Sequence, residues 1–142
     1  MIKEKGQLSL EYMIVLAAFL ALLGMLAPFL VQTQALAQLS LDKKTAQVFL
    51  AEIKGKTDQL KLMGDGSNFT IRVRPINSWI IIVDDDEIEV VFPQLKNLEE
   101  KSEPLKVTLG TELEDNILDV NGLTVFSLKK EGGEISLTKS EP

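Results

Sequence analysis

The feature that most constrains the fold is an unbroken apolar block, Tyr12 to Val31, which contains no charged side chain. At about 1.5 Å of rise per residue, a helix of this length crosses a hydrocarbon core of about 30 Å. Lys3 and Lys5 precede the block, and basic residues on the short leading side favour a cytoplasmic N-terminus. The sequence therefore predicts a single N-terminal membrane span, with the remainder of the chain outside the cell.

Beyond the block, the apolar residues thin out and fall three or four positions apart, which is typical of a helix with one apolar face. They are Leu36, Leu39, Ala46, Phe49, Leu50, Ile53 and Leu60. We expect one helix from Gln7 to Met63, apolar all round in its first half and amphipathic in its second. Pro28 should kink this helix, because its ring clashes with the preceding turn and it lacks an N–H. Gly64 is expected to cap the C-terminal end.

From Asn68 onward, short runs of β-branched and aromatic residues predict strands. The runs are Phe69 to Arg74, Trp79 to Val83, Glu87 to Phe92, Leu105 to Leu109, Leu123 to Leu128 and Glu134 to Thr138. Asp84 to Asp86 and Glu131 to Gly133 are expected to form tight turns, and consecutive short strands favour an antiparallel meander. Such a sheet must bury one face, for which the amphipathic half of the helix is the available cover. The predicted fold class is α+β, a long N-terminal helix packed on a C-terminal antiparallel sheet.

Composition narrows the possible functions of the chain. Its 142 residues carry a formal net charge of −6, and no cluster of lysine and arginine suggests a nucleic-acid partner. Histidine and cysteine are both absent, which removes Cys/His zinc sites, thiol nucleophiles and the usual general base. Carboxylate chemistry remains possible, but no catalytic constellation singles it out, so we expect no enzyme activity, no cofactor and no metal site.

The residues before the apolar block form a recognisable motif, Gly6-Gln7-Leu8-Ser9-Leu10-Glu11-Tyr12. The motif resembles the Gln-x-Ser-x-Glu (class III type) signal of archaeal prepilins, a branch of the type IV pilin-like proteins. The resemblance implies that a prepilin peptidase, a membrane aspartyl protease, cuts between Gly6 and Gln7 and leaves the apolar segment on the mature chain. That one cut puts Glu11 at the fifth mature position and Pro28 at the twenty-second, where many type IV pilins also have Glu and Pro.

The resemblance implies a leader at residues 1–6, a transmembrane and filament-core helix at 7–35, and an extracellular head at 36–142. It implies a structural subunit of a pilus used for adhesion or surface attachment, held in the cell membrane before assembly and in a surface filament afterwards. Its partners would be the peptidase and copies of itself or related pilins. A carboxylate at the edge of an apolar helix is costly in lipid, so Glu11 should seek a partner. The new amine of Gln7 on an incoming subunit would supply one and help to set axial register.

Two other interpretations of the N-terminal segment remain open. The apolar block can be a signal anchor for an external β-rich binding domain that does not polymerise, with Glu11 only an interfacial flank residue. Alternatively, Ala35-Leu36-Ala37 fits the A-x-A pattern of a signal-peptidase site and would release a soluble domain starting at Gln38. Against the second alternative, the apolar run is longer than the roughly 7–15 residues of a typical signal core.

The predicted head offers three further candidates. Asn68-Phe69-Thr70 is a glycosylation sequon where a loop enters a strand. Asp84 to Asp86, with Glu87 and Glu89, form the densest acidic cluster. We favour a solvated hairpin turn over a calcium site there, since the spacing does not fit an EF-hand loop. Trp79 is expected in the core rather than in an adhesive surface patch.

Overall fold

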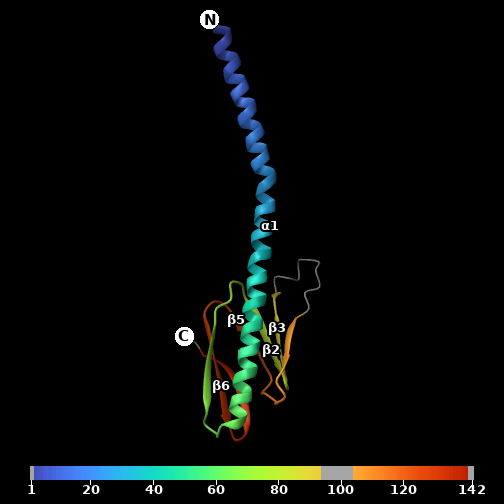
Figure 1. The fold of residues 1–142 in the computed structure, drawn as a ribbon, viewed down its shortest axis with the longest axis vertical. Helices are drawn as coiled ribbons and strands as arrows, with labels where there is room; N and C mark the ends of the chain where they lie inside the picture. The colour runs from blue at the N-terminus through green and yellow to red at the C-terminus, as the bar shows by residue number, and fades with distance from the viewer. Residues whose placement is uncertain (1, 94–103, 141–142) are drawn as a thin grey trace. The chain divides into compact units, whose positions relative to one another are not determined.

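The computed structural model describes residues 2–93 and 104–140, and within them a long helix is followed by seven strands. The helix is α1 (Ile2–Leu62). The strands are β1 (Asn68–Val73), β2 (Trp79–Asp84), β3 (Glu87–Val91), β4 (Leu105–Thr108), β5 (Asn116–Val120), β6 (Thr124–Glu131) and β7 (Glu134–Ser140) (Figure 1). Every strand pair in the two sheets is antiparallel, which confirms the predicted α+β class.

The chain divides into two compact units, Met1–Ala37 and Gln38–Pro142, which we call the stalk and the head. The described part of the stalk is helical throughout, and α1 continues without interruption through Pro28. Proline removes one hydrogen bond from the helix but does not end it here. The helix begins five residues before the predicted start and ends one residue before the predicted end.

The head contains two sheets rather than the single meander that we expected. One has the strand order β1-β6-β7 and the other β4-β3-β2-β5. The meander prediction holds for β2, β3 and β4, but β1 pairs with β6 instead of its sequence neighbour β2. Strand β5 was not predicted, because it is an edge strand in which only Val120 is buried and the alternation of apolar residues is weak.

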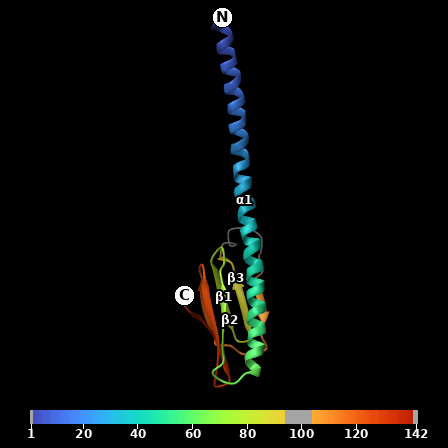
Figure 2. The same cartoon turned by 60° about the vertical axis from the view of Figure 1, so that its left-hand side comes forward.

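Helix α1 covers the inner faces of both sheets with the predicted face from Ala46 onward (Figure 2). Leu36, which the sequence assigned to the same face, lies in the stalk and is 55% exposed. Phe49 lies between them, with its ring centroid 6.3 Å from that of Trp79 on β2 and 5.2 Å from that of Phe126 on β6. The buried apolar residues of the helix are Ala46, Phe49, Leu50, Ile53 and Leu60. Because one helix face contacts both sheets, it joins them around a single core.

A buried carboxylate ties the loop between β1 and β2 to the start of the head helix. Asp42 is only 1% exposed. Its oxygens accept hydrogen bonds from the backbone N–H of Ile76 at 2.8 Å, from that of Asn77 at 3.1 Å and from the Asn77 side-chain amide at 2.7 Å. Three donors thus offset part of the cost of burying this charge.

The C-terminal end of α1 is capped by a lysine from β6 rather than by Gly64. The Lys130 ammonium donates to the carbonyl oxygens of Lys61 at 3.3 Å and Met63 at 2.8 Å. Gly64 does not adopt the left-handed conformation of a glycine cap, so that prediction was wrong. A cation satisfies the last carbonyls of the helix and also favours its negative dipole end.

Candidate functional site

The stalk helix exposes large apolar side chains around its whole circumference. Between Leu10 and Val31 their exposed fractions range from 46% to 77%. They belong to Leu10, Tyr12, Met13, Ile14, Val15, Leu16, Phe19, Leu20, Leu22, Leu23, Met25, Leu26, Phe29, Leu30 and Val31. Contiguous apolar surface on this scale marks an interface with lipid or protein.

Helix α1 is long and apolar enough to cross a membrane, and its most apolar window is 0% buried within the chain. A helix that served as the core of a soluble domain would bury that window against other elements of the same chain. The N-terminal helix is therefore a possible membrane-spanning segment, consistent with anchoring of the chain at a membrane.

The residues of the predicted signal all lie on α1. Gly6, Gln7 and Ser9 are helical, and the side chains that the structure describes begin at Leu10. Glu11 and Tyr12 are exposed, and none of the ion pairs among the described residues involves Glu11. The Glu11 carboxylate is thus exposed on the helix surface, where a group from another molecule can reach it.

Two other sequence candidates in the stalk are also exposed positions of the helix. Pro28 lies within the apolar surface, between exposed Leu26 and Phe29. Ala35-Leu36-Ala37, the alternative processing site, forms the last residues of the stalk and is helical. All four positions are accessible to another molecule.

The sequon lies at an accessible edge of the head. Asn68 is the first residue of β1, an edge strand, and both Asn68 and Thr70 are exposed. Phe69 between them is half-buried, with the Lys56 ammonium 4.5 Å from its ring centroid. Because side chains alternate along a strand, the two polar groups of the sequon share one face.

The acidic residues after β2 form a tight turn, as predicted. Asp85 adopts a positive φ of 49°, and its N–H donates to a carboxylate oxygen of Asp115 at 2.9 Å. The following loop docks on this turn, since the N–H groups of Leu109 and Leu113 donate to the carbonyl oxygens of Asp86 and Asp85, each at 2.7 Å. Asp115 had escaped prediction because it lies far from the turn in sequence.

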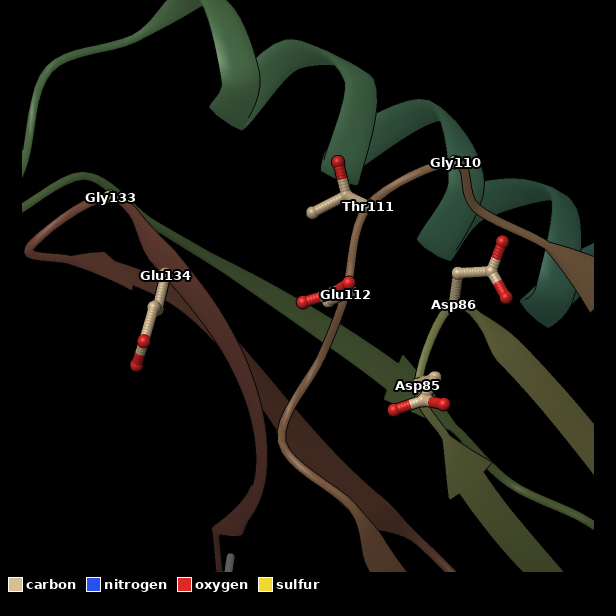
Figure 3. A pocket seen from close by; sticks show the side chains of 7 residues that line it. All are labelled: Asp85, Asp86, Gly110, Thr111, Glu112, Gly133 and Glu134. Atoms are coloured by element: carbon tan, nitrogen blue, oxygen red, sulfur yellow. The ribbon is translucent and has the colours of Figure 1, made fainter.

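Carboxylates crowd around this turn. Oxygen atoms of Asp84, Asp85 and Asp115 lie within 4.8 Å of one another, and an open hollow of about 720 Å³ adjoins them. Figure 3 shows that its side chains come from three segments, the β2–β3 turn, the loop after Gly110 and the start of β7. Carboxylate oxygens suit Ca²⁺. All three aspartates are exposed, however, and Asp115 already accepts a backbone hydrogen bond, which is the arrangement of a solvated turn.

Next to the turn, the outer face of the four-stranded sheet carries a small charge network. The Lys106 ammonium lies 3.5 Å from carboxylate oxygens of both Glu87 and Glu89. The negative charges of Glu87 and Glu89 raise the pKa of Lys106 above its ordinary value. This lysine therefore partly neutralises the acidic face.

Trp79 is fully buried, so the core prediction is confirmed and the residue is not part of an adhesive surface. Its ring packs edge-on against Phe92 at a centroid distance of 6.0 Å.

No protein-family model matches the chain, and no curated protein or solved structure is significantly similar to it. The function is therefore inferred from the exposed surfaces of the stalk and the head.

Proposed function

We propose that this chain is a structural subunit of an archaeal type IV-like pilus used for adhesion or surface attachment. The observation that carries the proposal is the stalk, whose apolar side chains are exposed all round although the same helix goes on to bury a face in the head. Its signal-like motif adds a reason to prefer polymerisation over simple anchoring. In the membrane, lipid covers the stalk, and in the filament the stalks of neighbouring subunits replace that lipid.

The composition of the stalk suits close packing of helices. Ala17, Ala21 and Gly24 recur at spacings of four and three, and small residues at such spacings let helix backbones approach. Lipid is already apolar, so the hydrophobic effect alone does not drive the transfer from membrane to filament. Extraction of the subunit therefore requires an external motor, and side-chain packing then holds the assembled helices together.

Glu11 would set the axial register of this packing. Prepilin peptidase would cut between Gly6 and Gln7 and create a new amine, and the exposed Glu11 carboxylate of a neighbour would pair with it. The head lies outside the cell in this arrangement, which makes Asn68 available for glycosylation. The subunit would pass from the cell membrane to a surface filament.

The test is electron microscopy of native surface filaments combined with N-terminal sequencing and intact-mass measurement of their subunit. We expect filaments that contain this chain, with a mature N-terminus at Gln7. A native product that begins at Gln38 would refute the proposal, because the stalk would then have been discarded by cleavage after Ala37.

A membrane-anchored β-rich binding domain that does not polymerise is the second candidate. The observation in its favour is that the head has its own core, in which Trp79, Phe126 and Ile53 are fully buried without help from another chain. Such a head needs no filament to fold. A native chain that keeps its residues 1–6, in cells without filaments containing it, would favour this alternative.

A further inference from the structure

The head has two ends that differ in charge. We call the end that contains the start of the head helix the proximal end, because the chain passes from the stalk into the head there. The hydrogen bonds from Ile76 and Asn77 to Asp42 place the β1–β2 loop at this end. The strand registers add the end of β5, opposite Trp79, and the start of β6, opposite Val73. The opposite, distal end holds the end of α1, the β2–β3 turn and the β6–β7 turn.

Carboxylates gather at the distal end and unpaired cations at the proximal end. The distal carboxylates of the described residues are those of Asp58, Asp65, Asp84, Asp85, Asp86, Glu87, Glu112, Glu114, Asp115, Glu131 and Glu134. Lysines at that end, such as Lys61 and Lys130, offset only part of this charge. The proximal cations are Lys43, Lys44, Arg72, Arg74 and Lys139. Asp119 is the one exposed carboxylate described at the proximal end, since Asp42 is buried. The described proximal surface is therefore positive, although the whole chain has a net charge of −6.

The two arginines of the chain, Arg72 and Arg74, both lie at the proximal end. Burial alternates from Ile71 to Pro75, so both arginine side chains leave the outer face of the three-stranded sheet, about 7 Å apart along the chain. Proline favours an extended conformation in the residue before it, which keeps Arg74 in line with the strand. Arg72 lies opposite Val125 on β6, and neither arginine has an ion pair with another described residue.

The cations nearer the distal end differ, because most of them are bound within the head. Lys61 and Lys130 donate to backbone carbonyl oxygens, Lys129 pairs with Glu131, and Lys106 is shared by two glutamates. Four proximal cations have no such bond to a described residue, namely Lys43, Lys44, Arg72 and Arg74. A positive surface of this kind attracts an anionic partner from outside the head.

A short stretch of α1 ties the proximal end to the possible membrane span. Asp42 follows Val31, the last residue of the apolar block, by eleven residues, which is about 16 Å of helix rise. Lipid headgroups extend about 5–7 Å beyond the hydrocarbon core on each side. The remaining separation is comparable with the Debye length of about 8–10 Å. When the apolar block spans the membrane, the proximal cations are therefore within electrostatic range of the headgroups.

We propose that the proximal end of the head binds anionic lipid headgroups while the chain is held in the membrane, with Arg72 and Arg74 binding the lipid phosphate. This inference rests on the membrane-held stage of the proposed function and needs no filament. A guanidinium group binds phosphate oxygens through two parallel N–H···O bonds, and two neighbouring arginines strengthen the site. Lys43 and Lys44 add point charges at the same end. A lipid phosphate is the favoured anion, because the span brings it next to these residues.

The distal carboxylates add to this preference, because an anionic membrane surface repels them. The charge difference between the two ends thus favours one orientation of the head, with its proximal end toward the lipid. Subunit extraction from the membrane would have to break these contacts.

The test reconstitutes the full chain in vesicles and measures energy transfer from Trp79 to a dansyl group on a trace of headgroup-labelled lipid. Trp79 is the only tryptophan and the first residue of β2, so the transfer reports how close the proximal end lies to the membrane surface. One set of vesicles contains phosphatidylcholine alone, and the other contains equal parts of phosphatidylcholine and phosphatidylglycerol. We expect more transfer in the anionic vesicles, and we expect the difference to shrink in about 1 M salt, where the Debye length is about 3 Å.

Arg72→Gln/Arg74→Gln should lower the ratio of docked to undocked heads in anionic vesicles by about 25-fold, since each basic residue near such a surface contributes about fivefold. Lys54→Gln/Lys106→Gln is the matched control, because it removes the same charge from the middle of the head and should leave the ratio unchanged. Arg72→Lys/Arg74→Lys keeps the charge but loses the bidentate geometry, so its ratio should lie between those of the wild type and the glutamine variant. An unchanged circular dichroism spectrum confirms that each head is folded.

Two results would overturn the proposal. One is equal transfer from the wild type in neutral and anionic vesicles, and the other is an equal loss in the arginine variant and its matched control. The outcomes are independent of the proposed pilus function. Docking in vesicles together with native cells that form no filaments of this chain would refute the pilus and keep the lipid contact, whereas filaments without docking would refute the lipid contact alone.

Discussion

The two halves of α1 have the same secondary structure and opposite relationships to the rest of the chain. In the head, Phe49 and Ile53 are 2% and 0% exposed, whereas in the stalk Phe19 and Leu23 are 55% and 46% exposed. The head half therefore contributes to folding, and the stalk half leaves its apolar surface for contact with lipid or another molecule. An apolar side chain on a helix therefore indicates its role only when the surface that covers it is known.

The same contrast holds for the acidic residues of the two halves. Asp42 in the head is buried and receives three hydrogen bonds, while Glu11 in the stalk is exposed and has no ion-pair partner among the described residues. Burial with three hydrogen bonds indicates a structural role for Asp42. For Glu11, the proposed role is contact with another molecule beside the apolar surface. These contrasts predict that substitutions in the head affect folding and that substitutions in the stalk affect assembly.

The largest expected effect is that of Phe49→Ala, because it removes the ring that joins the two sheets. It should lower the free energy of unfolding of the head by about 3–5 kcal/mol. Phe19→Ala in the stalk is the matched control and should leave that free energy unchanged. Denaturant unfolding of the detergent-solubilised chain, followed by Trp79 fluorescence, measures both. Comparable losses from the two variants would show that the stalk takes part in folding the head.

Asp42→Ala should have the next largest effect. It leaves the N–H groups of Ile76 and Asn77 without their acceptor, and the loss should be about 1.5–3 kcal/mol of unfolding free energy. Asp58→Ala is a suitable control on the same helix, because its carboxylate is exposed and its one ion pair among the described residues is with Lys61 at the surface. Hydrogen exchange at the Ile76 and Asn77 amides should quicken in the first variant only. Unchanged exchange there would contradict the role of Asp42 as the anchor of this loop.

Glu11→Ala should leave the head intact and impair assembly. We expect filament yield to fall by about tenfold, since the amine of the neighbouring subunit loses its partner in an apolar setting. Glu112→Ala removes an exposed carboxylate from the head and serves as the control. Electron microscopy and subunit quantification give the yield. Normal assembly of the Glu11 variant would remove the proposed role in register while leaving the stalk as the packing surface.

Local signals were sufficient to predict the helix, its buried face and the turns, because each depends on residues close together in sequence. The apolar spacing around Phe49 gave the correct face of the helix. Long-range features were missed: the pairing of β1 with β6 depends on residues far along the chain. Asp42 resembled any charged residue of a surface helix, and nothing near it in sequence indicates the loop that supplies its hydrogen bonds.

The smallest effect on stability is expected from Asn68→Gln, which tests whether the head half lies outside the cell as the stalk half crosses the membrane. Asn68 is exposed at an edge strand, so the substitution should change unfolding free energy by no more than about 0.5 kcal/mol. In native material, the subunit should nevertheless lose the mass of a glycan. Thr70→Val should cause the same loss, and Thr70→Ser should retain the glycan, since serine preserves the acceptor motif. Wild-type subunits whose intact mass equals that of the bare polypeptide would refute glycosylation at Asn68. A glycan present in Asn68→Gln at full wild-type mass would instead place the modification elsewhere on the chain.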